Sequence, residues 1–565
     1  MGRRPTRGRL GEAAAAFASN WRNPSLRRAQ LSFFAEWTAG CAFTVALSVV
    51  AFTSGGALAV GLVGLITVAP SAFLTPLLAP LADRGRRERV LVFAAAVRGV
   101  AFIAAAVVVA MSGPLAVVLL LAAASAVPAT LYRPAHSALL PTLSRSGREL
   151  TSANVVRGLL DSTANLIGPA VAAVLIATVN VAAVMAVSGA AGLCAAALVF
   201  GLRYDAPARQ TPERRPALVR EAIEGIQVVI HRRDLTLVLT LTTAQILTRG
   251  ALIVFSVVVA VQLLSMGEAG TGTLMAALGA GAVIGSLAVS ILVSTWRLGA
   301  WFAIGIGLWG LPFALIGVFP QQATALSMLA LVGAGNALVD AAGFTLIGRL
   351  APDTAMARVF TLLESLGAIA TGAGSMLASA LIQWFSIEVA LIAIGLLCPA
   401  LAVASWWRLR TLDRSVAALD AEIGLLQNVP MLDPLPLPAV EQLARGLQTV
   451  TTSTGETVFA QGDVGDLYYV IESGEADVWG AGRRITTLGA GEGFGEIALL
   501  RSTPRTATVT ARTDLTLRTL DAECFTGAVL GYVPSARAAT QNVESSLRRY
   551  APGDAADDAA DDAAP

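Results

Sequence analysis

Long apolar stretches dominate the chain from about residue 29 to about residue 408. An α-helix needs about 20 mostly apolar residues to cross a bilayer. Segments of that length recur roughly twelve times, and we expect them to start near residues 29, 58, 90, 115, 151, 181, 234, 270, 298, 323, 359 and 386. An even number of spans puts both ends of the chain on one side of the membrane.

Arginines occupy alternate connections between these spans. The arginine-bearing connections contain Arg84 to Arg89, Arg133 to Arg148, Arg203 to Arg233, Arg297, Arg349, Arg358, Arg408 and Arg410. No arginine occurs in the other connections, around Gly55, Gly113, Asn180, Gly267, Pro320 and Ser386. Because membrane proteins keep basic loops in the cytoplasm, we predict that the arginine-bearing connections and both termini are cytoplasmic.

The longest connection, residues 204–233, divides the predicted spans six and six. The run Leu159-Leu160-Asp161-Ser162 in the fifth span recurs as Leu362-Leu363-Glu364-Ser365 in the eleventh, which is the placement that duplicated halves require. We therefore predict a cytoplasmic N-terminal segment at residues 1–28 and two six-helix halves at residues 29–203 and 234–409.

The pattern changes after Arg410. Residues 410–427 read as an amphipathic linker helix. Within residues 428–550, short apolar alternations broken by glycines from Glu456 to Thr519 predict a compact antiparallel β-roll, and helices return from Asp521. Residues 551–565 alternate Asp and Ala and are too polar to fold. The predicted fold is thus an α-helical polytopic membrane protein with a C-terminal α+β domain.

Composition supports a membrane protein. The mean hydropathy is +0.69, with 55% hydrophobic and only 14% charged residues, which is too apolar for a soluble multidomain chain. All 40 basic residues are Arg, and the excess of Ala and Gly is typical of a GC-rich bacterial genome. We therefore expect a multi-pass protein of the bacterial inner or plasma membrane. The four cysteines are scattered singly and predict neither a disulfide framework nor a metal site.

The connection after the second span has a recognisable sequence, Leu81-Ala82-Asp83-Arg84-Gly85-Arg86-Arg87. It resembles the loop signature of the major facilitator superfamily, although Ala79 stands where the family usually has Gly and the Asp-to-Arg spacing is one residue short. Ala138 to Pro141, Ser152 to Asn154 and Gly168-Pro169 are similar to the exporter branch of that superfamily. The resemblance implies alternating access between two halves, with a cytoplasmic gate loop formed by Asp83, Arg84 and Arg87.

Charged residues inside the predicted spans are few. Each costs roughly 2.5 to 3.5 kcal/mol at a helix centre on insertion scales, so each needs a partner or water. They are Glu36, Arg98, Arg157, Asp161, Arg249, Asp340 and Glu364. Spacings of four residues put Arg157, Asp161 and Asn165 on one stripe, as they do Gln245 with Arg249 and Asn336 with Asp340. We expect these stripes to face the bundle interior.

Five of these residues are candidates for transport or coupling: Glu36, Asp161, Arg249, Asp340 and Glu364. We place Glu36 and Arg249 beside a central cavity, where Glu36 binds a cation or carries a coupling proton. Asp161 and Glu364 would pair across the halves with loop arginines as a gate. The alternative is that Arg157 and Asp161 pair within one helix and only permit insertion.

Other features favour packing over chemistry. The glycines from Gly279 to Gly285 indicate close helix packing rather than a dinucleotide loop. His136 and His231 each stand alone in predicted loops, and we expect both at the surface. No Walker loop, His-Glu metal motif or serine nucleophile elbow is present in the sequence, so we predict no catalytic residues and no enzyme.

The β-roll region carries a second recognisable pattern. The run Phe494-Gly495-Glu496-Ile497-Ala498-Leu499-Leu500 is followed by Pro504-Arg505-Thr506-Ala507-Thr508-Val509. Upstream stand Gly455, Gln461-Gly462-Asp463, Gly465-Asp466, Tyr469 to Ile471 and Ser473-Gly474. Together they resemble the cyclic nucleotide-binding domain family from about Asn428 to Tyr550, which implies a site formed by Phe494, Gly495, Glu496, Ile497, Ala498, Arg505, Thr506 and Ala507.

Each role in this site has a physical basis. A buried Arg can meet a cyclic phosphate with two charge-assisted hydrogen bonds, the role we give Arg505. The resemblance assigns backbone donors to Ile497 and Ala498, and Glu496 accepts from the ribose 2′-hydroxyl. Thr506 can donate to the phosphate or to a guanine amino group, so we favour cAMP with cGMP as the alternative. The alternative for Glu496 and Arg505 is a surface ion pair on a non-binding roll.

Three functions follow from this combination. The first is a secondary transporter, with efflux of a small solute and proton or ion coupling, regulated by cytoplasmic cyclic nucleotide. The second is a cyclic nucleotide-gated channel, but the chain lacks a voltage-sensor arginine row and a filter string. The third is a non-transporting receptor or scaffold. Residues 534–550 read as one helix, a lid carrying Val543 and Leu547, where a transcription factor would have DNA-binding helices. We thus expect lipid, solute and nucleotide as partners, no nucleic acid, and leave the oligomeric state open.

Overall fold

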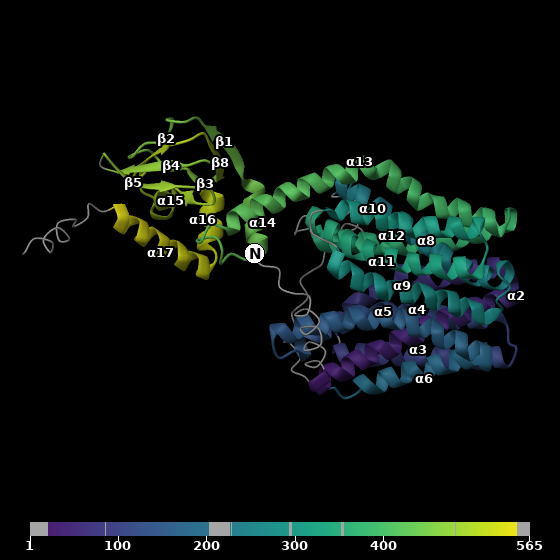
Figure 1. Ribbon diagram of the computed structural model, residues 1–565. Helices are drawn as coiled ribbons and strands as arrows, with labels where there is room; N and C mark the ends of the chain where they lie inside the picture. Colours follow the sequence, from purple (N-terminus) through teal and green to yellow (C-terminus); the bar gives the residue numbers. More distant parts are fainter. Residues whose placement is uncertain are drawn as a thin grey trace, which may run out of the picture. The chain divides into compact units, whose positions relative to one another are not determined.

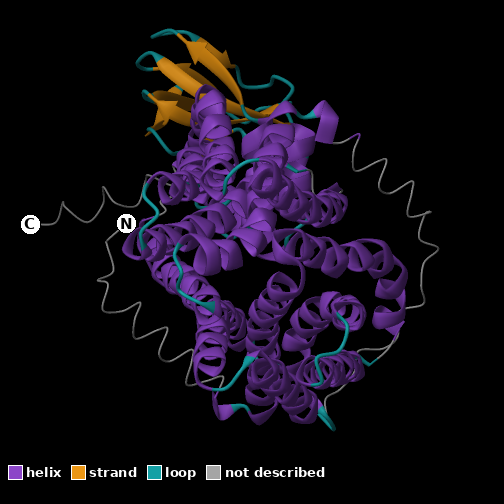
Figure 2. Cartoon of the chain, turned by 90° about the vertical axis from the view of Figure 1, so that its right-hand side faces the viewer, coloured by secondary structure: helices purple, strands orange, loops and turns teal. Residues whose placement is uncertain are grey.

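The computed structural model describes residues 21–84, 86–202, 227, 229–292, 297–351, 355–480 and 482–550. The chain forms two compact units, Met1–Leu412 and Asp413–Pro565. In the described residues the first unit is helical, and every strand belongs to the second (Figures 1 and 2). The units are considered separately below.

The first unit consists of long apolar helices. They are α2 (Pro24–Arg84), α3 (Arg87–Ala110), α4 (Leu115–Leu143), α5 (Gly147–Thr178), α6 (Val181–Val199), α8 (Arg233–Val258) with the π-helical η1 (Val259–Leu263), α9 (Glu268–Leu292), α10 (Leu298–Val318), α11 (Gln322–Leu350), α12 (Met356–Trp384) and α13 (Ile387–Gln427). The described part of the chain contains 11 helices long and apolar enough to cross a membrane.

Helix α2 contains a break. At 61 residues it would be about 90 Å long if straight, roughly three times the hydrocarbon thickness of a bilayer. Gly55 and Gly56 have non-helical backbone angles, and Gly56 has a φ of 63°, which favours glycine. The break lies where the sequence predicts the first connection on the non-cytoplasmic side. It supports a count of twelve spans, which stays a prediction.

Several helices extend beyond the predicted spans. Arg133 and the segment from Ala138 to Pro141, expected in a connection, lie within α4, and Arg349 and Arg358 lie within α11 and α12. A run of apolar residues marks only the part of a helix that is embedded in hydrocarbon, whereas helices continue past it into the interface. The predicted loops around these residues are therefore shorter in the structure.

His136 is not at the surface, contrary to our expectation. It is fully buried in α4, where its Nε2 lies 3.2 Å from the carbonyl oxygen of Ala29 and its ring centroid lies 4.7 Å from that of Phe33. The expectation failed because His136 belongs to a helix rather than a loop, on the face that packs against α2. His231 is exposed, as predicted.

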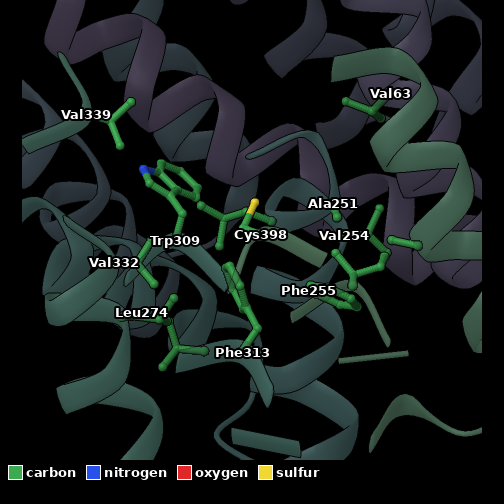
Figure 3. Close-up of a cluster of buried hydrophobic side chains, with 14 of the residues drawn as sticks. Val63, Ala251, Val254, Phe255, Leu274, Trp309, Phe313, Val332, Val339 and Cys398 are labelled. Atoms are coloured by element: carbon green, nitrogen blue, oxygen red, sulfur yellow. The ribbon is translucent and has the colours of Figure 1, made fainter. Parts of the chain in front are cut away.

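We divide these helices by chain order into a first group, α2 to α6, and a second group, α8 to α13 (Figure 1). In the first group α3 packs against α4 and α6, and in the second α11 packs against α9 and α10. The second group surrounds a cluster that includes Phe255, Trp309, Phe313 and Cys398 (Figure 3), in which the Phe255 and Phe313 ring centroids lie 5.8 Å apart. This cluster is part of a larger core that also includes residues of the first group.

Small residues line the seam between the groups, which we call the glycine seam: Gly61 and Gly64 of α2, Ser375 and Ser379 of α12, and Gly272 and Gly279 of α9. The hydroxyl groups of Ser375 and Ser379 donate to the carbonyl oxygens of Gly61 (3.1 Å) and Ala57 (2.8 Å). A Cβ atom on Gly272 would lie 2.6 Å from the carbonyl oxygen of Pro169 in α5.

Close helix packing, predicted for the Gly279 to Gly285 string, is thereby confirmed. A Cβ atom on Gly279 would lie 2.5 Å from the Cα atom of Leu166 in α5, and one on Gly285 would lie 2.6 Å from that of Ala334 in α11. Helices can approach this closely only where both surfaces carry small residues.

Aromatic residues mark where α13 would meet the two membrane surfaces. Trp384 and Phe385, just before α13, are exposed, as is Trp407 further along it. The guanidinium of Arg410 lies 4.8 Å from the ring centroid of Trp406 and 5.9 Å from that of Trp407. The stretch between these aromatic ends is about 20 residues, the length of one span, and Trp next to Arg is typical of the interface.

The second unit is built around two four-stranded sheets. Its strands are β1 (Gln448–Thr452), β2 (Thr457–Phe459), β3 (Leu467–Ser473), β4 (Ala476–Gly480), β5 (Arg483–Leu488), β6 (Gly493–Phe494), β7 (Thr508–Ala511) and β8 (Leu515–Asp521). The sheet orders are β1-β8-β3-β6 and β2-β7-β4-β5, with antiparallel pairing throughout. The predicted antiparallel strands are confirmed.

Helices cover one side of these sheets. They are α14 (Leu437–Gly446), α15 (Glu496–Arg501), α16 (Ala522–Leu530) and α17 (Val533–Tyr550). The last turns of α13 join their core through Ile423 and Leu426, in a cluster where the Tyr468 and Phe525 rings stack with centroids 4.2 Å apart. Helix α13 therefore begins in the first unit and ends within the core of the second.

Candidate functional site

A sharp turn joins β6 to α15. Gly495 has a φ of 93°, in the left-handed region, and caps α15 at its N-terminus. A Cβ atom there would lie 2.6 Å from Nη1 of Arg505 and 3.2 Å from the carbonyl oxygen of Leu467. Both the backbone angle and the space therefore require glycine, which brings the first turn of α15 next to Arg505. That turn contains Ile497 and Ala498, the residues expected to offer backbone donors.

Arg505 is the buried cation of this site. Its residue surface is 4% exposed, and it donates to the carbonyl oxygens of Gly495 (3.0 Å) and Leu467 (2.8 Å). The guanidinium carbon lies 4.2 Å from the ring centroid of Phe459, within cation–π range. Its Nε atom is buried and has no hydrogen-bond partner among the described residues. Burial lowers the pKa of Arg505, but an arginine stays protonated in proteins. Arg505 therefore keeps its positive charge, and its Nε–H group can still donate a hydrogen bond to a ligand.

Glu496 lies one residue after the turn and is also buried, at 5% exposure. Burial raises the pKa of its carboxyl to about 7, against the opposing effects of its backbone hydrogen bond and of Arg505. Near neutral pH a substantial fraction of this carboxyl is therefore protonated, whereas an ordinary exposed Glu would be fully ionised.

The other predicted site residues gather around this pair. Phe494 is buried and its ring stacks on that of Tyr469 with centroids 5.0 Å apart. Ala507 is buried and Thr506 is half-buried. The eight residues of the predicted site thus lie on β6, in the turn at Gly495, on α15 or in the connection from α15 to β7.

A glycine loop holds the main chain at Arg505. The N–H of Arg505 donates to the carbonyl oxygen of Asp463 (2.8 Å), and the N–H of Gly462 donates to that of Arg505 (2.9 Å). A Cβ atom on Gly465 would lie 2.6 Å from the Cβ of Ala498 and 3.3 Å from the guanidinium carbon. The upstream glycine motif is therefore part of the same site. The arrangement suits a small anion with a hydroxyl nearby, because one buried cation and one buried carboxyl stand side by side.

The lid helix is described in part. Residues 533–550 form α17, and Val543 is buried, as expected of a residue on the inner face. The side chain of Leu547, the other predicted lid residue, lies outside the described residues.

In the first unit, Glu36 pairs with Arg98. Glu36 of α2 is fully buried, Arg98 of α3 is nearly so, and Nη1 of Arg98 donates to Oε1 of Glu36. The guanidinium also lies 5.3 Å from the ring centroid of Phe102. The structure thus brings together two predicted charges that the sequence left unpaired, within one helix group and away from solvent.

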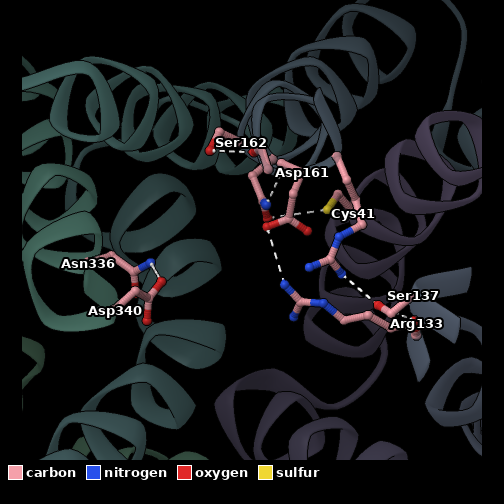
Figure 4. A network of polar contacts seen from close by, with 10 residues as sticks. Cys41, Arg133, Ser137, Asp161, Ser162, Asn336 and Asp340 are labelled. Carbon is pink, nitrogen blue, oxygen red and sulfur yellow. Dashed lines mark hydrogen bonds and ion pairs between the residues drawn. The ribbon is translucent and has the colours of Figure 1, made fainter. Parts of the chain in front are cut away.

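The other intramembrane charges are less buried, and Figure 4 shows polar contacts of Asp161 and Asp340. Asp161 of α5 pairs with Arg133 of α4, with 3.7 Å between Oδ2 and Nη2, and Arg157 donates to the Ser137 hydroxyl (3.0 Å). The alternative of an ion pair between Arg157 and Asp161 within α5 is therefore not what the structure contains. Asn336 donates to Asp340 (2.9 Å), as their predicted stripe requires.

Arg249 and Glu364 are solvent-exposed on α8 and α12. The cross-half pairing that we expected for Asp161 is not present, since its partner Arg133 belongs to the same helix group. Arg133 was missed as a candidate because it falls in a predicted loop. Arg133 lies four residues before Ser137, a spacing that puts both side chains on one face of a helix. This spacing could have identified Arg133 as part of a helix.

The predicted gate loop is described only at its end. The side chains of Asp83 and Arg84 lie outside the described residues. Arg87, in the first turn of α3, donates to the carbonyl oxygen of Ala138 in α4 (2.5 Å). The Arg87 side chain therefore ties the start of α3 to the end of α4.

Models of two known families each match a segment of the chain. Residues 31–266 match the model of the Major Facilitator Superfamily, and residues 449–531 match that of the cyclic nucleotide-binding domain. Both are families of non-catalytic domains. The two resemblances that the sequence motifs predicted are thereby confirmed.

The chain is also similar to individual proteins over a short segment. The cAMP-dependent protein kinase regulatory subunit of Schizosaccharomyces pombe is 44% identical over 103 residues, which is 18% of this chain and 25% of that protein. The subunit of Yarrowia lipolytica is 41% identical over 104 residues, 18% of this chain and 28% of that protein. The chain thus spans about a quarter of the length of these relatives.

Among solved structures, "cAMP bound PfPKA-R (141-441)" is 25% identical with a TM-score of 0.23, covering 24% of this chain and 48% of that one. The regulatory domain of Toxoplasma gondii PKA with cAMP is 22% identical with a TM-score of 0.22, covering 24% and 52%.

Proposed function

We propose that this chain, in which a Major Facilitator Superfamily domain is joined to a cyclic nucleotide-binding domain, is a secondary active transporter regulated by cyclic nucleotide. It exports a small solute by alternating access, coupled to protons or another ion, and its second unit is the cytoplasmic sensor. The observation that carries the proposal is the buried Arg505 beside Glu496 in a chain whose described residues include 11 helices long and apolar enough to cross a membrane.

The domain boundaries of the proposal follow the sequence. A cytoplasmic segment at residues 1–28 precedes the transporter halves at residues 29–203 and 234–409. The linker helix at residues 410–427 leads to the sensor at residues 428–550. Helix α13 runs without interruption from Ile387 to Gln427, so the same helix provides the last span and the linker.

The cyclic nucleotide binds at Arg505, Glu496 and the first turn of α15. The Arg505 guanidinium binds the cyclic phosphate through its unpartnered Nε and a free face of its terminal nitrogens, and the N–H groups of Ile497 and Ala498 add donors. The Glu496 carboxylate accepts from the ribose 2′-hydroxyl. We propose cAMP as the ligand, since the two curated relatives are named as cAMP-dependent. Thr506 keeps cGMP as the alternative.

Regulation requires the nucleotide to prefer one state of the transporter. A tenfold difference in affinity between two states shifts their equilibrium by about 1.4 kcal/mol. Helix α13 is the covalent route for this shift, because its last turns belong to the core around Tyr468 and Phe525. A rearrangement of that core on nucleotide binding would act directly on the helix that begins as the last span.

Solute flux from proteoliposomes, with and without cAMP on the sensor side, tests the proposal. We expect solute release that responds to a proton or cation gradient, and a change of at least about threefold when cAMP is added. The Arg505→Ala variant should transport but ignore cAMP. Binding of cAMP without flux of any solute would instead indicate a receptor or scaffold, and single-channel currents would indicate a channel.

The binding of cAMP should weaken as the pH falls below about 7. Burial raises the pKa of Glu496 to about 7, and the ionised carboxylate is the better acceptor for a hydroxyl donor. Each further pH unit toward 5 should therefore cost up to about tenfold in affinity. Calorimetric titration of the full chain between pH 5.5 and 8 measures this, with the buffer's protonation enthalpy varied to count protons released.

The stability of the second unit should depend on the ionisation of Glu496 in the opposite direction from cAMP binding, decreasing as the pH rises. The folded pKa of Glu496 lies above its ordinary value of 4.5, so the native state binds more protons than the unfolded state between these values. The contribution of Glu496 to the stability of the second unit is fully present below pH 4.5 and is lost as the pH rises through about 7.

Glu496→Gln should bind cAMP more weakly and with little pH dependence. A wild-type affinity that is constant from pH 5.5 to 8 would contradict this role.

A further inference from the structure

Five charged side chains from four helices form one group in the first unit, which we call the central cluster: Arg133 of α4, Arg157 and Asp161 of α5, Arg249 of α8 and Asp340 of α11. None lies in the first or last turn of its helix. Charges so far from the helix ends need partners or water, because an isolated charge in hydrocarbon is costly.

The members of the cluster face one another across the two helix groups. Asp340 interacts electrostatically with Arg249, Arg133 and Asp161, and Arg157 does so with Arg133 and Asp161. Figure 4 shows Asn336 and Asp340 on one side, and Asp161 with Arg133 on the other. Glu364 of α12, also exposed, is not among the groups that act on Asp340 or Arg157.

Several side chains of the cluster are exposed. The Arg133 side chain is 52% exposed and that of Asp161 is 26% exposed, and Arg249 and Asp340 are also exposed. These exposed charges come from both helix groups. In alternating access a solute binds at the interface between the two halves of a transporter.

Positive charge is in excess in the cluster. Three arginines stand against two aspartates, and only Arg133 makes an ion pair, with Asp161. Arg157 donates to Ser137, while its Nε is buried without a partner. Among the described residues Arg249 makes no hydrogen bond or ion pair that involves its side chain. Donor capacity for an anion is therefore present on both helix groups, on α5 and on α8.

We infer that the central cluster binds the transported solute through an anionic group, and that the solute is a small organic monocarboxylate. A guanidinium matches a carboxylate with two parallel hydrogen bonds, and the exposed Arg249 has no ion-pair partner among the described residues. The cluster has one more positive charge than negative charges, and one carboxylate would neutralise that excess. A dianion would exceed it and be repelled by the two aspartates. This inference rests on the proposed transport function but is independent of its regulation.

The test uses solutes that differ in charge and little else. The full chain in proteoliposomes is assayed with acetate, acetamide and ethylamine, with benzoate, benzamide and benzylamine, and with the cationic dye ethidium. We expect the carboxylate of at least one set to be transported at least tenfold faster than its neutral and cationic counterparts. The Arg249→Gln variant should lower that rate by at least about tenfold. Arg249→Lys should keep part of the rate.

Arg297→Gln is the matched control, because Arg297 is an exposed arginine at the start of α10, outside the cluster. It should transport as the wild type does. Thermal unfolding of each variant separates a folding defect from a binding defect, and Arg249→Lys serves if Arg249→Gln unfolds. Preference for a neutral or cationic solute, or a carboxylate rate unchanged in Arg249→Gln, overturns the inference and leaves the transporter intact. Transport of none of the solutes overturns the proposed function as well.

Discussion

Replacement of Arg505 by alanine should raise the dissociation constant of the full chain for cAMP by at least about 100-fold. Arg505 offers a buried positive charge, and hydrogen bonds to charged groups contribute about 1.5 to 3 kcal/mol each, so the loss of two removes about 3 kcal/mol or more. The variant also leaves the carbonyl oxygens of Gly495 and Leu467 without their donor. Isothermal titration calorimetry at pH 8, where Glu496 is ionised, measures the effect.

Two further variants show whether the loss is specific. Arg512 of the same unit forms an exposed ion pair with Glu475 (3.2 Å), so Arg512→Ala should bind cAMP normally. Arg505→Lys keeps the charge but not the planar fork, and it should fall between the wild type and Arg505→Ala. Equal affinity of Arg505→Ala and the wild type, with both folded, would show that the roll does not bind nucleotide through this residue.

Replacement of Glu36 by glutamine should destabilise the first unit by about 3 to 5 kcal/mol, because it leaves the nearly buried Arg98 without its counter-charge. Considered from the sequence alone, this substitution should abolish transport in a folded protein. The buried ion pair changes that expectation, since loss of transport would also follow from loss of folding. Thermal unfolding of the purified chain in detergent measures the stability directly.

The double variant separates the two roles of Glu36. In the double variant Glu36→Gln, Arg98→Gln neither side chain is charged, so no unpaired charge is buried. Most of the stability lost in Glu36→Gln should therefore return. If that stable double variant loses proton-linked flux, Glu36 carries the coupling proton; if it transports normally, Glu36 only neutralises Arg98. Additive losses in the two single variants and their combination would show that the pair does not contribute to stability as one unit.

The nucleotide site could be predicted from the sequence because its determinants are local. Gly495 is required by a backbone angle at one position, and Glu496 to Ala498 follow it directly in the chain. Arg505 returns to Gly495 over only ten residues. The contact of Arg505 with Phe459 could not be predicted, since it depends on the pairing of β2 with β7, which follows Arg505 in the chain.

The pairing of charges in the first unit was predicted least well. Glu36 and Arg98 are 62 residues apart, and Arg133 and Asp161 lie on different helices. Hydropathy locates spans but does not say which faces meet, and it ends each span where the apolar run ends. Arg133 and His136 were therefore assigned to a loop, although α4 continues to Leu143.

The glycine seam has an energetic consequence for the transport cycle. The seam consists of backbone and small side chains, and its hydrogen bonds join hydroxyls to carbonyl oxygens without any ionised group. Membrane potential acts only on charge, at about 2.3 kcal/mol per elementary charge moved through 100 mV, and salt screens only charge. Separation of the seam should therefore be insensitive to voltage and to ionic strength. Any electrical signature of the cycle must arise from the charged residues of the first unit, from the coupling ion and from the charge of the solute.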